Sequence, residues 1–283
     1  MTRRSGLSGA QIASIVLLVI FGVIWLIPVG AALVDTVRAN SGQPAAMVVR
    51  LLPRLSHALM LSVLVAVPAA ALSTAFGAMA GYAVSKKKFF GRRMFFGTLV
   101  GAIFMPAAVL MVPLLRLTAT LGIYDTPAAL ILPCSATAFA VVFMKVAIDR
   151  ISSDILDSAR IDGLGELAVF TRMVLPQVRW PLAALLFIEF ISNWGALAVP
   201  MAVVDSPRNS TLALYLGSAL QSLNPPAAAQ LLLAVALVAV PAIVLFLLKS
   251  GDIISGLLAT LFRYERVDGR MMSDGPSDGP SDE

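Results

Sequence analysis

The segment that governs the fold prediction is DSARIDGLGELAVFTRMVLPQ, residues 157–177. It is a charged stretch between two apolar runs, Thr126–Met144 and Trp180–Val204. Each run is long enough to cross a bilayer, because about 20 helical residues span a hydrocarbon core of roughly 30 Å. Between Lys145 and Arg179, five acidic residues balance five basic ones. We therefore predict that this segment lies outside the bilayer and serves a function other than crossing it.

The rest of the chain is strongly apolar. Of its 283 residues 59% are hydrophobic and 13% are charged, with a mean hydropathy of +0.89. A soluble domain has too little interior to hide that much apolar surface. We therefore predict an all-α integral membrane protein with six transmembrane helices, in runs that each hold at most one Asp, Glu, Lys or Arg: Ser5–Val34, Leu55–Ser85, Met94–Leu115, Thr126–Met144, Trp180–Val204 and Ala227–Leu248.

The basic residues predict the orientation of these helices. Segments on the same side as the N-terminus hold 16 of the 21 Lys and Arg residues, which leaves Arg38, Arg50, Arg54, Arg116 and Arg208 on the other side. Because cytoplasmic loops carry the excess of Lys and Arg, both termini are predicted to be cytoplasmic. The positive charge then faces the anionic lipid of the inner leaflet, and we expect no nucleic acid partner.

Several function classes are excluded by residue counts. Cys134 and His57 are each the single residue of their type, so one chain holds neither a disulfide nor a His/Cys metal cluster. There is also no GxxxxGK[ST] phosphate-binding motif. We therefore expect no metal, cofactor or ATP bound by this chain and no enzymatic activity of its own.

Local signals in the charged segment predict a helix–turn–helix. A short helix over Ile155–Ile161 has three candidate N-caps: Ser152, Ser153 and Asp154. Gly163 and Gly165 are predicted to break it, because glycine readily adopts left-handed turn geometry. A second helix follows, with an apolar stripe at Leu167, Phe170 and Val174. An interfacial hairpin lying on lipid is the alternative, but its balanced charges argue against that, since anionic headgroups favour a basic excess.

Two features of the predicted spans have open alternatives. Gly77–Gly81 and Gly97–Gly101 form GxxxG spacings, which either let helix backbones approach closely or arise by chance in glycine-rich spans. Glu189 is the one charge inside a span, and intramembrane acids face the bundle interior. It either lines a pathway, accepting hydrogen bonds from a substrate or meeting a second subunit, or serves as a polar clamp between helices.

The charged segment also resembles a known family. DSARIDGLGELAVFTRMVLPQVRWP resembles the EAA loop of bacterial ABC importer permeases, with Asp157, Ser158 and Ala159 at Glu-Ala-Ala, Gly163 at the following Gly, and Leu175–Pro176 at the closing pair. The variant with Asp162 before Gly163 is similar to the carbohydrate branch, typified by maltose-type permeases. Two further stretches, GYAVSKKKFFGRR (81–93) and MVPLLRLTATLGIYDTPAALILP (111–133), resemble the same branch, and the resemblance extends to Phe262.

Two positions depart from the family pattern. Asp157 and Ser158 stand for Glu and Ala, and Trp194–Gly195 stands where the family has Trp-Asn.

The resemblance implies a role for the loop and a set of partners. The loop, about 150–178, would be a coupling helix that contacts a cytoplasmic ATPase through Asp157, Ser158, Ala159, Arg160, Asp162, Gly163, Leu175 and Pro176. The expected partners are a second homologous permease subunit, usually giving a heterodimer, an ABC ATPase dimer that holds ATP and Mg, and an extracellular or periplasmic substrate-binding protein.

The implied function is half of an ATP-driven translocation pathway for a sugar, in a multi-pass protein of the bacterial plasma (inner) membrane. Residues 1–262 would form the permease domain and residues 263–283 a cytoplasmic tail with a disordered end. Glu189, Asn193 and Trp194 are the candidate pathway residues. The alternatives are an ion-coupled secondary transporter and an ABC importer permease for a non-sugar solute.

Overall fold

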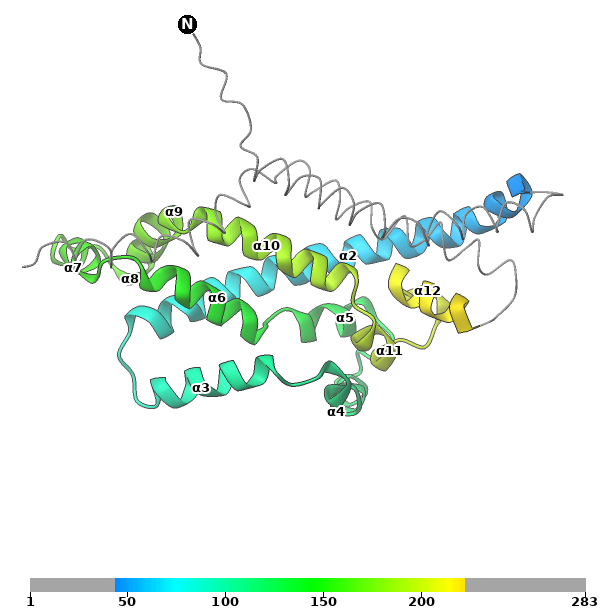
Figure 1. Cartoon of the computed structure of the whole chain (residues 1–283), viewed down its shortest axis with the longest axis horizontal. Coiled ribbons are helices and arrows are strands. Elements are labelled where there is room, and N and C mark those ends of the chain that lie inside the picture. Colours follow the sequence, from blue (N-terminus) through cyan, green and yellow to red (C-terminus); the bar gives the residue numbers. More distant parts are fainter. Residues whose placement is uncertain (1–43, 222–283) are drawn as a thin grey trace, which may run out of the picture.

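A computed structural model of the chain describes residues 44–221, within which every regular element is a helix (Figure 1). The predicted spans Ser5–Val34 and Ala227–Leu248 lie outside the described residues, as does the predicted tail 263–283. The prediction of an all-α fold is confirmed for the described part of the chain.

Two helical stretches are long and apolar enough to cross a membrane. The first is Pro53–Lys86, the greater part of α2 (Pro44–Lys86), which corresponds to the second predicted span. The second is Pro127–Asp149, which joins α5 (Pro127–Cys134) to α6 (Ala138–Asp149) and corresponds to the fourth. Thr137 starts α6 by accepting a hydrogen bond from the Ala140 amide at 3.1 Å.

The third and fifth predicted spans are interrupted helices. The run Met94–Leu115 was predicted as one helix, but it divides into α3 (Arg92–Ile103) and α4 (Ala107–Thr120), whose axes differ by 103°. Pro106 lies at the bend with an extended ψ of 133°, since proline has no amide hydrogen for the helix and disfavours helical geometry in the residue before it. The run Trp180–Val204 divides into α10 (Arg179–Trp194) and α11 (Ala198–Val203). The second pair that could form one bent span joins Glu166–Gln177 to α10 at an angle of 81°, so the described residues support two to four spans, depending on whether this pair and the α3–α4 pair each form one span.

Helix α2 is the centre of the packing, with α6 and α10 against it (Figure 1). A Cβ atom on Gly77 would lie 2.7 Å from the Ala140 Cβ atom, and one on Gly81 would lie 2.9 Å from the Lys145 backbone nitrogen. The GxxxG of α2 therefore does bring two helix backbones together. The second one does not within the described residues, because nothing lies within 4 Å of such an atom on Gly97 or Gly101.

At one end of the molecule, hydrogen bonds join segments that lie far apart in the sequence. Asp125, with a φ of +56°, donates its amide to the Val203 carbonyl at 2.9 Å and accepts from the amides of Asp205 and Ser206, both at 3.2 Å. This ties the α4–α5 turn to the loop before η2 (Pro207–Asn209). The amide of Leu212, at the start of α12 (Leu212–Gln221), donates to a buried Ser62 hydroxyl at 2.7 Å.

The charged segment lies at the opposite end. There α7 (Ser153–Ile161) and α8 (Glu166–Ala168) meet the end of α2 and the end of α6, while α4 and α11 lie at the far end (Figure 1). The segments 86–93 and 145–179, which together hold ten of the Lys and Arg residues on the N-terminal side, therefore share one end, as the predicted orientation requires. That this end is cytoplasmic stays a prediction.

Candidate functional site

The first arm of the charged segment is a helix with defined caps. The Ser152 hydroxyl accepts from the Asp154 amide at 3.2 Å, and α7 runs to Ile161. Gly163 then takes a φ of +87°. Its amide donates to the Arg160 carbonyl at 3.0 Å, and that of Leu164 donates to the Ala159 carbonyl at 3.1 Å, which is a Schellman motif. The predicted helix and its break at Gly163 are confirmed.

The second arm departs from the predicted stripe. It consists of α8, a π-helix η1 (Val169–Val174) and α9 (Leu175–Gln177), followed by a bend of 81° into α10. Of the predicted stripe, Val174 is fully buried and Phe170 is partly buried, as predicted, but Leu167 is 77% exposed, and Val169 is fully buried. Because the i→i+5 hydrogen bonds of a π-helix widen its turn relative to an α-helix, residues 169 and 174 share its buried face.

One face of the segment is anchored to the rest of the chain. Leu156 and Ala159 from α7, with Val169 and Val174 from η1, enter a core that includes Ile148 at the end of α6. The opposite face is open. It carries three exposed large apolar side chains and three exposed acids: Ile155, Ile161, Leu167, Asp154, Asp157 and Asp162. We call residues 152–178, with this anchored face and this open face, the hairpin.

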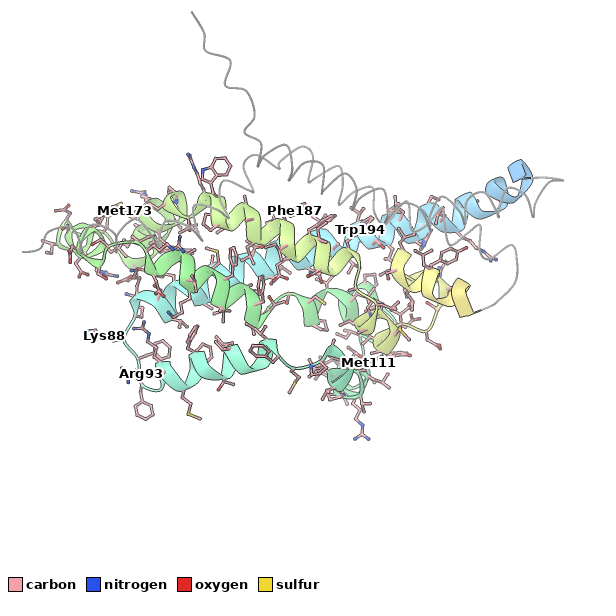
Figure 2. The ribbon with its side chains drawn as sticks, viewed as in Figure 1. Lys88, Arg93, Met111, Met173, Phe187 and Trp194 are labelled. Carbon is pink, nitrogen blue, oxygen red and sulfur yellow. The ribbon has the colours of Figure 1, made fainter. Side chains whose placement is uncertain are left out.

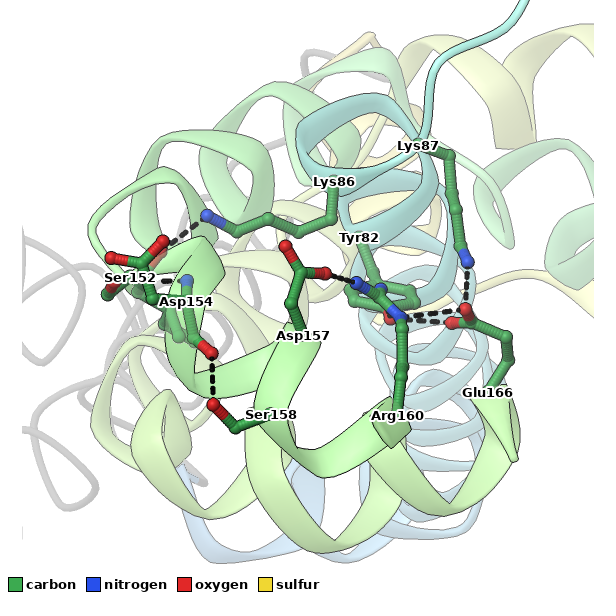
Figure 3. A network of polar contacts seen from close by, with 10 residues as sticks. Tyr82, Lys86, Lys87, Ser152, Asp154, Asp157, Ser158, Arg160 and Glu166 are labelled. Carbon is green, nitrogen blue, oxygen red and sulfur yellow. Dashed lines mark hydrogen bonds and ion pairs between the residues drawn. The ribbon is translucent and has the colours of Figure 1, made fainter. Parts of the chain in front are cut away.

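A polar network joins the hairpin to the end of α2 (Figure 3). Glu166 is its hub. One carboxylate oxygen accepts from the Tyr82 hydroxyl at 2.9 Å, and the other accepts from the Arg160 Nε at 3.0 Å and forms an ion pair with Lys87. Arg160 also pairs with Asp157 and donates to the Tyr82 hydroxyl at 3.3 Å. Both arms of the hairpin are thus fixed to the end of α2, at Tyr82 within the helix and at Lys87 just after it.

The electrostatics of this network favour full ionisation. The hydrogen-bonded ion pair with Lys87, helped by Tyr82 and Arg160, lowers the pKa of Glu166 to about 2. Partial burial opposes the charge on Arg160, but its bonds to Glu166, Asp157 and Tyr82 outweigh that effect and raise the pKa of the guanidinium. The network is therefore held by full charges across the physiological pH range.

A second clamp ties the ends of α2 and α6 together beside the hairpin. Ser85 donates its hydroxyl to Asp149 at 2.6 Å, and Lys86 donates its ammonium to the Ile151 carbonyl. Asp149 in turn pairs with Lys145, four residues earlier on α6. The hairpin therefore begins just after the end of α6, which these contacts join to the end of α2.

The predicted loop residues divide between the two faces. Ala159 is buried, Arg160 and Leu175 are partly buried, and the others are exposed: Asp157, Ser158, Asp162, Gly163 and Pro176. Sequence reasoning missed Tyr82, Lys87 and Glu166. In the sequence Lys87 and Glu166 are members of charged segments, and Tyr82 is part of a predicted span. No local signal pairs residues that lie about 80 positions apart.

The buried acid Glu189 forms a separate polar site between three helices. Its carboxylate accepts from the hydroxyl of Thr137 at 2.6 Å, and that hydroxyl lies 3.1 Å from the Ser73 hydroxyl of α2. Glu189 is 3% exposed. Asn193 donates to the Glu189 backbone carbonyl at 2.8 Å, and Trp194 is buried and stacks on Phe190 at 5.6 Å. The three candidate pathway residues thus lie together on α10, in contact with their own chain.

Comparison with known proteins gives consistent matches. A family model described as binding-protein-dependent transport system inner membrane component matches residues 73–262. The lactose transport system permease protein LacG of Rhizobium radiobacter is 27% identical over 200 residues, which is 71% of this chain and 73% of that protein. The arabinooligosaccharides transport system permease protein AraQ of Bacillus subtilis (strain 168) is 30% identical over 66% of each chain. The sn-glycerol-3-phosphate transport system permease protein UgpE of Yersinia pestis is 28% identical over 64% of each.

A solved structure shares the fold. It is the crystal structure of a bacterial ABC transporter involved in the import of the acidic polysaccharide alginate. One of its chains superposes with a TM-score of 0.70 at 19% identity, covering 88% of this chain and 99% of that one.

Proposed function

The chain belongs to the family of binding-protein-dependent transport system inner membrane components, and from that premise we propose that it forms half of the pathway through which a sugar is imported. The sugar would be an oligosaccharide or a sugar derivative. The names of its relatives support this substrate class, because two of them carry lactose or arabinooligosaccharides. A relative named for sn-glycerol-3-phosphate favours, as the second candidate, a permease for a phosphorylated polyol.

The hairpin is the proposed site of contact with a separate ATPase. The observation that carries this proposal is its two-faced packing. Val169 and Val174 anchor one face in the core, while Ile161, 86% exposed, and Leu167, 77% exposed, stand on the open face. Exposed apolar side chains rimmed by charge are typical of protein interfaces.

The network around Glu166 gives the proposed contact a mechanical consequence. Because Glu166 and Arg160 bond to Tyr82 and Lys87, a displacement of the hairpin by the ATPase is passed to the end of α2. Helix α2 is in turn locked to α6 at Gly77 and Gly81. A displacement of the hairpin would therefore move α2 and α6 together rather than bend the loops that connect the hairpin to them.

The assembly that this function requires has the members expected from the sequence. We propose a second homologous permease subunit, an ATPase dimer that holds ATP and Mg on the cytoplasmic side, and a substrate-binding protein on the other side. Residues 1–262 would be the permease domain, with both termini in the cytoplasm and residues 263–283 as a tail.

The role of Glu189 is proposed from its surroundings. Its bond to Thr137 and its burial support the clamp, in which one carboxylate joins α6 to α10 close to α2. Substrate contact by Glu189, Asn193 and Trp194 is the competing proposal. The two are separated by substitution of Glu189, as described in the Discussion.

The coupling role is tested at the turn of the hairpin. Gly163→Val would place a β-branched side chain at a φ of +87°, a strain of about 1–3 kcal/mol. Gly165→Val is the matched control, because Gly165 lies in the same turn with a φ of −67° and open space around it. We expect the Gly163 variant to insert normally but to lose the ATPase on purification, or to retain it with hydrolysis uncoupled from uptake.

A second variant reverses a charge on the open face. Asp157→Lys would remove the partner of Arg160 and bring a like charge to the docking surface, where such contacts cost several kcal/mol. It should also weaken co-purification of the ATPase. If both variants retain full assembly and full coupled uptake, the hairpin is not the coupling element, although family membership would stand.

A further inference from the structure

A cavity of about 340 Å³ opens between the start of α3 and the end of α6. It is lined by three basic side chains and one aromatic ring: Arg92, Arg93, Phe96 and Lys145. The first three come from the start of α3 and the last from the end of α6. No acidic residue is among these lining residues.

Within the described residues, the positive charge of this cavity is largely uncompensated. Arg92 donates to two backbone carbonyls, those of Ser85 at 3.1 Å and Lys87 at 3.5 Å, and neither acceptor carries a charge. Arg93 is exposed and makes no hydrogen bond or ion pair with the described part of the chain. Only Lys145 has an acidic partner, Asp149 at 2.5 Å. Two guanidinium groups are therefore available to an anion.

The geometry of these groups suits a phosphate. Guanidinium groups present several N–H donors in a fixed plane and match phosphate oxygens in pairs. The Lys145 ammonium lies 4.7 Å from the centroid of the Phe96 ring, which holds this cation at the wall of the cavity. The hydrogen bonds of Arg92 to the loop carbonyls hold its side chain in place as well.

The surroundings of the cavity are apolar on the side that continues along the span. Phe96 and Ile103 lie seven residues apart on one face of α3, and Ile103 is 40% exposed. Met94 and Phe95 beside the cavity are exposed too, at 80% and 47%, and α3 buries no residue within the described chain. A ligand with a phosphate at one end and an apolar chain at the other matches this arrangement.

We propose that this cavity binds the phosphate of an anionic phospholipid headgroup, with the acyl chains along α3. Arg93 and Arg92 would contact the phosphate oxygens, while Lys145, paired with Asp149, would form the wall beside them. Basic clusters at the cytoplasmic ends of spans attract anionic lipid by about fivefold for each basic side chain near the surface. Figure 2 shows Arg93 and Lys88 at the end of the molecule that holds the hairpin.

Lipid binding is measured with the full chain and its co-purifying subunits in nanodiscs. Phe96→Trp keeps an aromatic ring in the cavity and provides a fluorescent reporter, read as the difference from the parent chain. Brominated phosphatidylglycerol quenches a nearby tryptophan, as does brominated phosphatidylcholine, so the ratio of their quenching gives the headgroup preference. We expect phosphatidylglycerol to be preferred at least fivefold.

The decisive variant is Arg93→Gln in the reporter background, because Arg93 holds no other described contact. It should reduce the preference about fivefold. Arg172→Gln removes one exposed charge from the hairpin instead and should leave the preference unchanged. Equal quenching by both lipids, or an unchanged preference in the Arg93 variant, would overturn the proposal. Displacement of phosphatidylglycerol by millimolar inorganic phosphate would also overturn it and assign the site to a soluble phosphate.

Discussion

The contact between α2 and α6 allows a sharp test of how the two spans are held. Gly81→Ala adds one methyl group that would lie 2.9 Å from both the Lys145 backbone nitrogen and the Met144 Cβ atom. Both neighbours belong to the helix framework, so no flexible side chain end can move aside. Overpacking of this kind costs about 1–3 kcal/mol. We expect the same substitution at Gly77, 2.7 Å from the Ala140 Cβ atom, to cost a similar amount.

The chain contains its own control for this substitution. Gly97→Ala and Gly101→Ala make the same chemical change in the same motif, but nothing in the described chain lies within 4 Å of the new atom. Since alanine is the better helix former, these two variants should be neutral or slightly stabilised. The difference between the two pairs isolates the close contact from any general effect of removing glycine.

The assay is heat inactivation of the assembled complex, followed as the fraction that remains monodisperse after a fixed time at each temperature. Gly81→Ala and Gly77→Ala should shift the midpoint downward, and the two control variants should not. If all four variants inactivate at the same temperature, the packing of α2 on α6 is looser than described. The transmission of hairpin movement through two joined spans would then lose its basis.

Three further predictions concern orientation, the buried acid and pH. A Cys introduced at Lys87 should be protected from an impermeant reagent in intact cells and one at Asp205 should react; the reverse pattern would refute the orientation. If Glu189 is a clamp, Glu189→Gln should keep assembly and uptake, because the amide oxygen still accepts a hydrogen bond from Thr137. Glu189→Leu should lower the yield of assembled complex, because it leaves the Thr137 hydroxyl unpaired at a cost of about 1–3 kcal/mol. Altered uptake in an assembled Gln variant would instead support the pathway role. The ion pair with Lys87 lowers the pKa of Glu166 to about 2, so the contribution of ionised Glu166 to stability should be complete above about pH 4.5 and be lost as the pH falls towards 2. Hydrogen exchange of residues 153–168 should speed up over this pH range. Glu166→Gln should abolish this pH dependence.

Local signals were enough to predict the first arm of the hairpin. A capping residue before α7 and a glycine after it are read within a few positions, and both Ser152 and Gly163 act as the pattern indicated. The second arm was predicted less well. Leu167 is exposed and Val169 is buried, since the arm continues as a π-helix whose wider turns shift the buried face, and the residue types of that arm do not indicate a π-helix.

Features that depend on distant residues were beyond local patterns. Pro106 marks a possible break, but the angle of 103° between α3 and α4 follows from how both helices pack, since a proline can also sit in a mild kink. The same holds for the hub at Glu166. Its charge was visible in the sequence, but the choice of Tyr82 as its partner depends on two helix ends meeting in space.

The turn at Asp125 has a consequence for the order in which this protein is made. Its side chain accepts from amides 80 and 81 residues further along, and its own amide donates to the carbonyl of Val203. A ribosome adds about 5–20 residues per second, so these donors emerge roughly 4–16 s after Asp125 itself. During that interval the amide of Asp125 lacks its acceptor, the Val203 carbonyl. The far end of the molecule can therefore close only after the hairpin and α10 have been synthesised, which makes its assembly a late step in biogenesis.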